Sequence, residues 1–164
     1  MAIARRVAGL TTVKIDAGQG AGIESLGYTQ DGAEIEFTTF WEDVYGDQNG
    51  GTNGPPIDTI DLGQIATVRL LLTSWETTVA DKIHAVVPNG TAGTAPTPGT
   101  LLFTTSARNY RVLLDNTNFD FNFPTCLIRD TRTFNVGTKH SKLLFVFTAY
   151  HPAGGGTLWN TTMT

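Results

Sequence analysis

The chain has 164 residues, of which 40% are hydrophobic and only 16% are charged, and its formal net charge is −4. A chain of this length makes one domain with a core large enough to fold without a disulfide or a metal ion. The acidic balance argues against a domain that grips nucleic acid by neutralising phosphates, and no stretch approaches the roughly 18 apolar residues that a membrane-spanning helix needs.

The N-terminal part predicts strands separated by turns. Val7–Ile15 predicts a first strand, and Asp31-Gly32 separates two further strand-like segments. An Asp-Gly pair between such segments predicts a hairpin, because both central residues of a type I′ turn need positive φ. Alternation in the second segment places one set of side chains on a common face, opposite Glu34 and Glu36: Ile35, Phe37, Thr39 and Trp41.

The middle of the chain predicts a long loop and then the only helix. Glycines and prolines concentrate in Gly46–Pro56, which cannot sustain a helix or a central strand, and a long loop is expected over about 42–56. Ala66–Leu72 predicts a strand. Thr73 and Glu76 have the spacing of a capping box, and an apolar series follows at helical spacing, which predicts a helix over about 74–87: Trp75, Val79, Ile83 and Val86.

The C-terminal half predicts strands again. A flexible loop over 89–100 precedes five candidate strands: Leu101–Thr105, Asn109–Asp115, Phe119–Asp130, Thr131–Val136 and Ser141–His151. Leu143–Tyr150 is apolar on both faces, so we expect it to be covered on both sides. An extended tail follows over 152–164. The expected fold is mainly β, a single domain over 1–164 with one helix.

No pattern predicts a catalytic, cofactor or metal site. The three histidines lack partners at metal-ligand spacing, and Cys126 lies in an apolar run where a free cysteine packs as a small hydrophobic residue. The loop acids lack the EF-hand spacing. The glycine-rich Gly18–Gly22 fails the dinucleotide-binding pattern. We therefore expect a protein that is not an enzyme and has no small-molecule substrate.

The order of elements resembles the tail tube proteins of tailed bacteriophages and, more loosely, the secreted ring protein of type VI secretion. The residues that carry the resemblance are Gly27–Phe37, the acidic aromatic segment Trp41–Asp47, Gly54–Asp58, Gly63, Ala66–Leu72, Phe123–Ile128, Asn135–Lys139 and Leu143–Tyr150. The resemblance implies an antiparallel β-sandwich or barrel with one flanking helix. It also implies a virion protein, made in the host cytoplasm, whose copies close into hexameric rings. The rings would stack into a tube through which DNA passes without specific binding.

The resemblance also implies partners and an interface. The partners would be copies of the chain and other virion proteins, with no membrane. The expected interface combines the long loop with the doubly apolar strand: Trp41, Glu42, Asp43, Tyr45, Asp47, Pro55, Pro56, Asp58, Phe145, Phe147 and Tyr150. Two alternatives stay open. One is a capsid decoration or head–tail neck protein. The more remote one is a carbohydrate-binding β-domain that uses Trp41, Trp75 or Trp159.

Overall fold

The computed structural model describes residues 3–7, 10–16, 22–29, 31–47, 54–84, 109–117, 119–128, 133–134, 143–152 and 155–162. Within these residues the chain forms ten strands and one helix: β1 Ile3–Val7, β2 Thr11–Asp16, β3 Glu24–Thr29, β4 Ala33–Val44, β5 Asp58–Leu72, β6 Ser74–Trp75, α1 Thr77–His84, β7 Tyr110–Asp115, β8 Phe121–Leu127, β9 Thr133–Phe134 and β10 Leu143–Ala149. Every strand pairing is antiparallel. The prediction of a mainly β, antiparallel fold with one flanking helix is confirmed.

The sheet closes into a barrel because its last strand, β6, continues directly from β5, which lies near the other end of the strand order. From β5 the order runs through β10, β8, β7, β2 and β3 to β6. Since β6 follows β5 after the single residue Thr73, the path returns to the strand from which it began. The Thr73 amide donates to the carbonyl of Tyr28 at 3.1 Å, and the Glu76 amide donates to that of Leu26 at 2.9 Å. Main-chain hydrogen bonds therefore continue across the junction.

Gly27 makes this closure possible. It pairs with Trp75 of β6 and has a φ of +146°. A Cβ at this position would lie 2.0 Å from the carbonyl oxygen of Ser74 and 2.8 Å from the Cα of Trp75. Both neighbours are backbone atoms that a side-chain rotation cannot move, so β6 reaches β3 only because residue 27 has no side chain.

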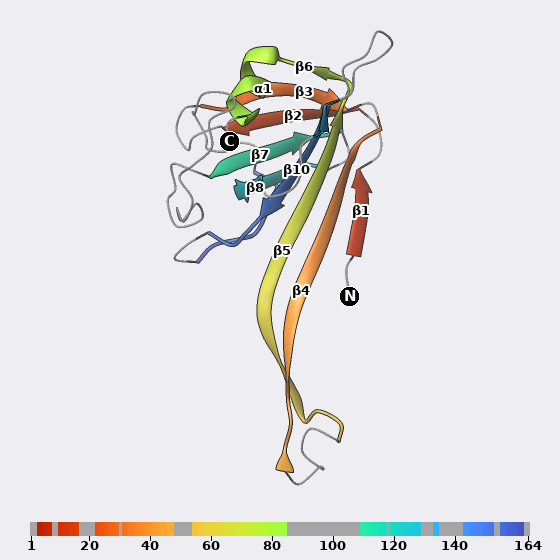
Figure 1. The fold of residues 1–164 in the computed structure, drawn as a ribbon, viewed down its shortest axis with the longest axis vertical. Coiled ribbons are helices and arrows are strands. Elements are labelled where there is room, and N and C mark those ends of the chain that lie inside the picture. Colours follow the sequence, from red (N-terminus) through yellow and green to blue (C-terminus); the bar gives the residue numbers. More distant parts are fainter. Residues whose placement is uncertain are drawn as a thin grey trace.

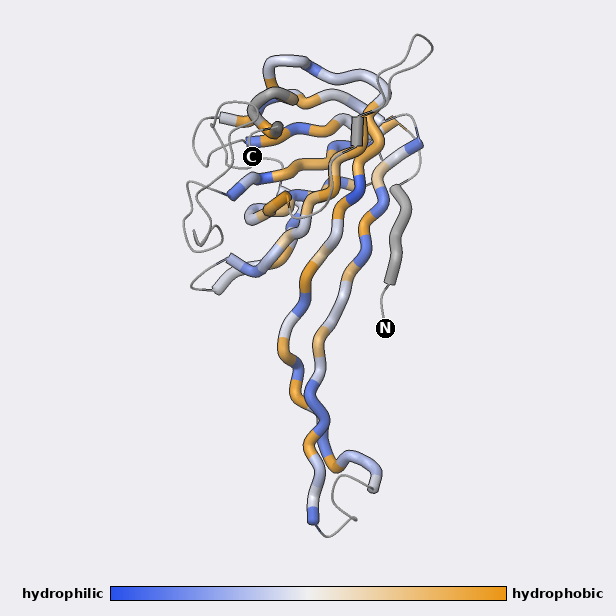
Figure 2. Tube along the Cα trace, in the orientation of Figure 1, coloured by the Kyte–Doolittle hydropathy of each residue, from blue (hydrophilic) through white to orange (hydrophobic). Residues whose placement is uncertain are grey.

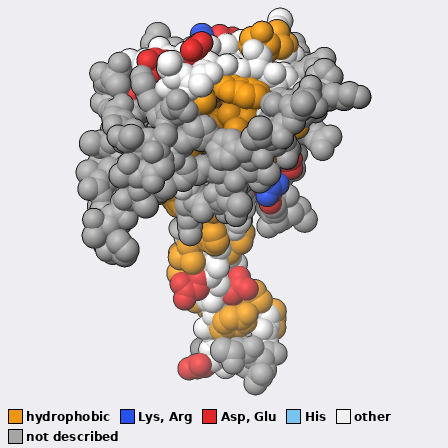
Figure 3. Space-filling model, turned by 45° about the horizontal axis from the view of Figure 1, so that its top comes forward, with side chains coloured by type: hydrophobic (Ala, Val, Ile, Leu, Met, Phe, Trp, Pro, Cys, Tyr) orange, Lys and Arg blue, Asp and Glu red, His pale blue; other side chains and the backbone are white. Residues whose placement is uncertain are grey.

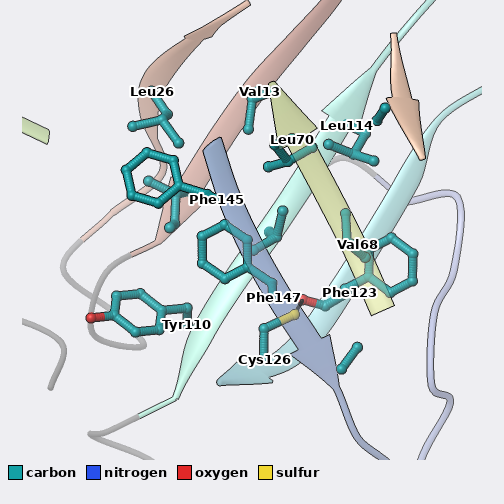
Figure 4. Packing of buried hydrophobic residues seen from close by; sticks show 14 of the residues in the cluster. Val13, Leu26, Val68, Leu70, Tyr110, Leu114, Phe123, Cys126, Phe145 and Phe147 are labelled. Atoms are coloured by element: carbon teal, nitrogen blue, oxygen red, sulfur yellow. Dashed lines mark hydrogen bonds between the residues drawn. The ribbon is translucent and has the colours of Figure 1, made fainter. Parts of the chain in front are cut away.

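The core lies between strands that cross one another. In Figure 1, β4, β5 and β10 run along the long axis, while β2, β3 and β7 run across it. The inward side chains of both sets meet in a single cluster, in which Phe145, Phe147, Tyr110 and Cys126 face one another (Figure 4). The expected alternation is confirmed on β4 and β5, since Ile35 and its neighbours on the paired strand are all buried: Ala66, Val68, Leu70 and Leu72.

Two predicted local structures are wrong. The Asp31-Gly32 turn does not make a hairpin: β3 pairs with β2 and β6, and β4 pairs with β5 and β1. The turn does use a positive φ, +82° at Gly32. Tertiary pairing decided the outcome, because the apolar faces of β3 and β4 are buried against different strands. The predicted first strand, Val7–Ile15, has the wrong bounds: residues 11–15 lie in β2, whereas Val7 is the last residue of β1, which pairs with β4.

The helix begins later than expected. It starts at Thr77, after residues 74–75 have been used as strand β6, and the Ala80 amide donates to the carbonyl of Glu76 at 2.9 Å. Thr73 binds Tyr28 instead of capping the helix, so the capping-box prediction is wrong. The predicted apolar face is confirmed for Val79 and Ile83, which are buried. The predicted loop 89–100 and strand Leu101–Thr105 lie outside the described residues.

Candidate assembly surface

A two-stranded arm extends away from the barrel (Figure 1). Strand β1 pairs with β4 only as far as Phe37, and β10 pairs with β5 only from Ala66. Beyond these points Thr38–Val44 and Asp58–Ile65 pair only with each other among the described residues. We call these two segments with their connection, residues 38–65, the arm. Seven strand residues at about 3.3 Å each make an arm about 23 Å long.

The predicted loop over 42–56 is therefore partly strand. Glu42 and Asp43 pair with Ile60 and Thr59, and the Ile57 amide donates to the carbonyl of Val44 at 2.9 Å. The sequence signal for a loop comes from glycines and prolines that lie after Tyr45. The alternating segment that begins at Ala33 predicts a strand up to Tyr45, so the wrong part of the loop prediction is its start at residue 42.

A β-bulge interrupts the arm. Phe40 pairs with Gly63 and Trp41 pairs with Asp61, which leaves Leu62 as the extra residue. Gly63 has a φ of +103°, and its amide donates to the Asp61 carboxylate at 2.7 Å. Bulges bend a strand and increase its twist, so this feature changes the direction of the arm near its root.

The arm exposes apolar side chains on a scale that the barrel does not. Eleven large hydrophobic residues are exposed in the described part of the chain, and six of them lie on the arm: Phe40, Trp41, Tyr45, Ile57, Ile60 and Leu62. Figure 2 shows apolar positions alternating with polar ones along both strands, and Figure 3 shows hydrophobic and acidic side chains gathered on the arm. An isolated two-stranded ribbon is marginally stable in water, and clustered exposed apolar surface marks an interaction site.

The arm is also acidic. It carries five carboxylates and no lysine or arginine, a net charge of −5, whereas the remaining residues hold 11 basic and 10 acidic side chains: the arm acids are Glu42, Asp43, Asp47, Asp58 and Asp61. Several of these carboxylates accept hydrogen bonds from other residues of the arm. Asp43 accepts a hydrogen bond from the Thr59 hydroxyl at 3.1 Å, and Asp58 accepts one from the Thr59 amide at 2.8 Å. The described residues contain no cluster of acidic, histidine or cysteine side chains that could hold a metal ion.

The predicted interface residues divide into two groups. Those from the arm are all exposed: Trp41, Glu42, Asp43, Tyr45, Asp47, Pro55, Pro56 and Asp58. The structure brings them together on one projecting element. Sequence reasoning missed Phe40, Ile57, Ile60 and Leu62, although an apolar residue among acids at a turn could have suggested them.

The assignment of Phe145 and Phe147 to the interface is wrong. Both side chains are fully buried inside the chain's own barrel, and Phe147 makes an edge-on contact with Tyr110 at 6.0 Å. On the opposite face of β10, Val146 and Thr148 are buried as well. The strand is covered on both sides within the monomer. Tyr150, just after β10, is half-buried and donates its amide to the carbonyl of Thr125 at 3.0 Å.

Among the described residues, Cys126, Glu34 and Glu36 all make structural contacts. Cys126 is buried, its thiol donates to the carbonyl of Phe123, and removal from solvent raises its pKa while a backbone hydrogen bond opposes the rise. Glu34 and Glu36 form ion pairs with Arg69, at 3.5 and 3.7 Å. An open groove of about 630 Å³ beside this ion pair is lined partly by Leu71 and Leu144.

The three tryptophans do not form a shared sugar-binding platform. Trp41 is on the arm, Trp75 is on β6 next to Gly27, and Trp159 packs against Phe37 and Phe121.

Comparison with known proteins gave no match: no protein-family model, curated protein or solved structure matches the chain. Among the described residues no helix is long and apolar enough to cross a membrane.

Proposed function

We propose that this protein is a structural subunit that assembles with copies of itself through the arm. The observation that carries the proposal is the two-stranded ribbon beyond Phe37 and Ala66, with six exposed large apolar side chains and no covering layer among the described residues. A ribbon of this kind gains stability when a partner covers it, because burial of apolar surface contributes about 25 cal/mol per Å².

The charge distribution favours contact between the arm and a different surface of the next copy. Two arms packed against each other would bring two surfaces of charge −5 together, whereas the remainder of the chain has a net charge of +1. Contacts between unlike surfaces either close into rings or extend as filaments. This geometry supports a ring or tube subunit over a two-fold dimer joined arm to arm.

The specific assembly that we propose is the hexameric ring of a phage tail tube. Its support is the order of sequence elements together with a barrel that bears one projecting acidic arm. An acidic assembly would let DNA slide, because phosphate affinity grows with each charge neutralised. A capsid decoration or neck protein would use the same arm in a ring of another symmetry or on preformed heads. Symmetry determined by electron microscopy of the assembled particles separates these roles.

The test compares two exposed aromatic residues. Phe40 on the arm and Tyr28 on the barrel are both 46% exposed. Phe40→Ser should raise the concentration needed for assembly by about fivefold or more, since truncating an interface aromatic costs over about 1 kcal/mol. Tyr28→Ser makes a similar change on a strand and should leave that concentration nearly unchanged. Analytical ultracentrifugation and negative-stain microscopy measure both.

Two results would count against the proposal. A wild-type protein that stays monomeric at high concentration, without polymer after seeding, would refute self-assembly. Equal effects of Phe40→Ser and Tyr28→Ser would show that the arm has no special part in it.

A further inference from the structure

The C-terminal segment returns to the barrel and is held there by an isolated β-bridge. Asn160 and Asn122 of β8 exchange two main-chain hydrogen bonds, at 2.8 and 2.9 Å. Leu158 is buried within the core cluster. The segment Gly155–Thr162 is therefore a docked part of the fold, although the sequence predicts only an extended tail.

The Asn122 side chain fastens this segment. Its Nδ2 donates to Oδ1 of Asn160 at 2.9 Å and to the carbonyl of Thr162 at 2.7 Å. Its Oδ1 accepts a hydrogen bond from Nε of Arg111 at 3.0 Å. Asn122 is only 3% exposed, so water cannot replace these hydrogen bonds when they are lost, and their loss leaves buried polar atoms without partners.

The neighbouring Trp159 links the segment to the root of the arm. Its ring lies 5.1 Å from that of Phe121 on β8 and 6.1 Å from that of Phe37 on β4, measured between centroids. Phe37 is the last β4 residue paired with β1, and its β5 partner Ala66 is the last β5 residue paired with β10. Trp159 thus packs against Phe37, immediately before the arm begins, where the other strands stop supporting the β4–β5 ribbon.

From these contacts we infer that the C-terminal segment is a strap that fixes the direction of the arm, with Trp159 as the positioning residue. When Trp159 is removed, Phe37 loses the aromatic ring that connects it to Phe121 of β8. The β4–β5 ribbon can then change its angle to the barrel more easily. This inference concerns the monomer and does not depend on the proposed function.

The direction of the arm can be measured with a pair of spin labels. Asp47 at the arm tip and Ser25 on β3 are exposed, and each is changed to Cys in a Cys126→Ala background. Labelled protein diluted into excess unlabelled protein reports the distance between labels within one chain, whether or not the chains assemble. Pulsed electron resonance then gives the distance distribution between tip and barrel.

Three variants separate the strap from a general loosening. Trp159→Ala should widen the distribution about twofold or more, since a segment that loses its tertiary contacts opens locally. Trp159→Phe should stay narrow because an aromatic ring still bridges Phe37 and Phe121. Trp75→Ala is the matched control: it removes a half-buried tryptophan that packs on the core away from the arm root.

Two results of these measurements would overturn the inference. An unchanged width in Trp159→Ala, or equal widening in Trp75→Ala, overturns the inference. If Trp159→Ala does not fold, Asn160→Ala replaces it, because that change removes two side-chain hydrogen bonds of the strap and leaves the core intact. Asn160→Ala should widen the distribution less than twofold, and an unchanged width there also overturns the inference.

Discussion

Gly27 gives a sharp test of how the barrel closes. In Gly27→Ala the new Cβ meets two backbone atoms of β6 at 2.0 and 2.8 Å, and a φ of +146° is rarely adopted by any residue with a side chain. The backbone strain costs about 1–3 kcal/mol. Relieving the clash means moving β6 away from β3.

The rest of the expected loss in stability comes from the hydrogen bonds that join β3 to β6 and its neighbours. The bonds from Thr73 to Tyr28 and from Glu76 to Leu26 lie on either side of residue 27. Losing both costs about 1–3 kcal/mol at typical net values. Gly27→Ala should therefore lower the free energy of unfolding by about 2–6 kcal/mol, a large part of the stability of a domain this size.

The assay is urea unfolding followed by tryptophan fluorescence, because Trp75 sits at the seam. Gly22→Ala is the control: Gly22 also has a positive φ, +99°, but a Cβ there would meet nothing within 4 Å. Gly22→Ala therefore introduces the strain of a positive φ without a steric clash. If Gly27→Ala destabilises the protein no more than Gly22→Ala does, the account of barrel closure is wrong.

Two further predictions follow from the core. Phe147→Ala should lower the free energy of unfolding of the monomer by about 3–5 kcal/mol in urea titrations, as expected for a large side chain lost from a packed core; an unchanged monomer stability would return Phe147 to the interface. Burial raises the pKa of Cys126, so above about pH 8.5 the unfolded chain loses a thiol proton that the native chain keeps. Stability should then fall as pH rises, by up to about 1.4 kcal/mol per pH unit, and Cys126→Ala should lose that component of the slope. Identical pH dependence of the two proteins between pH 7 and 9.5 would contradict this reasoning.

Local chemistry in the sequence was enough to predict the class of fold. Alternation marked the buried face of β4 through Ile35 and that of β5 through Val68, because side chains on a strand point to opposite faces with a period of two. The glycines and prolines after Tyr45 marked a projecting connection, and the exposed arm residues were named from it. These features depend on neighbours along the chain, so they can be read without knowing the partners.

Tertiary structure alone decided which strands pair and which apolar residues are inside. The sequence could not distinguish Phe145 and Phe147, apolar and buried in the barrel, from Phe40 and Ile60, apolar and exposed on the arm. The difference is the number of neighbouring strands. Phe145 and Phe147 lie on β10 inside the sheet, whereas Phe40 and Ile60 lie beyond residue 66 of β5, where the pairing with β10 has ended. The same holds for Gly27 and Trp159, whose roles exist only because strands distant in sequence meet at the seam and at the arm root.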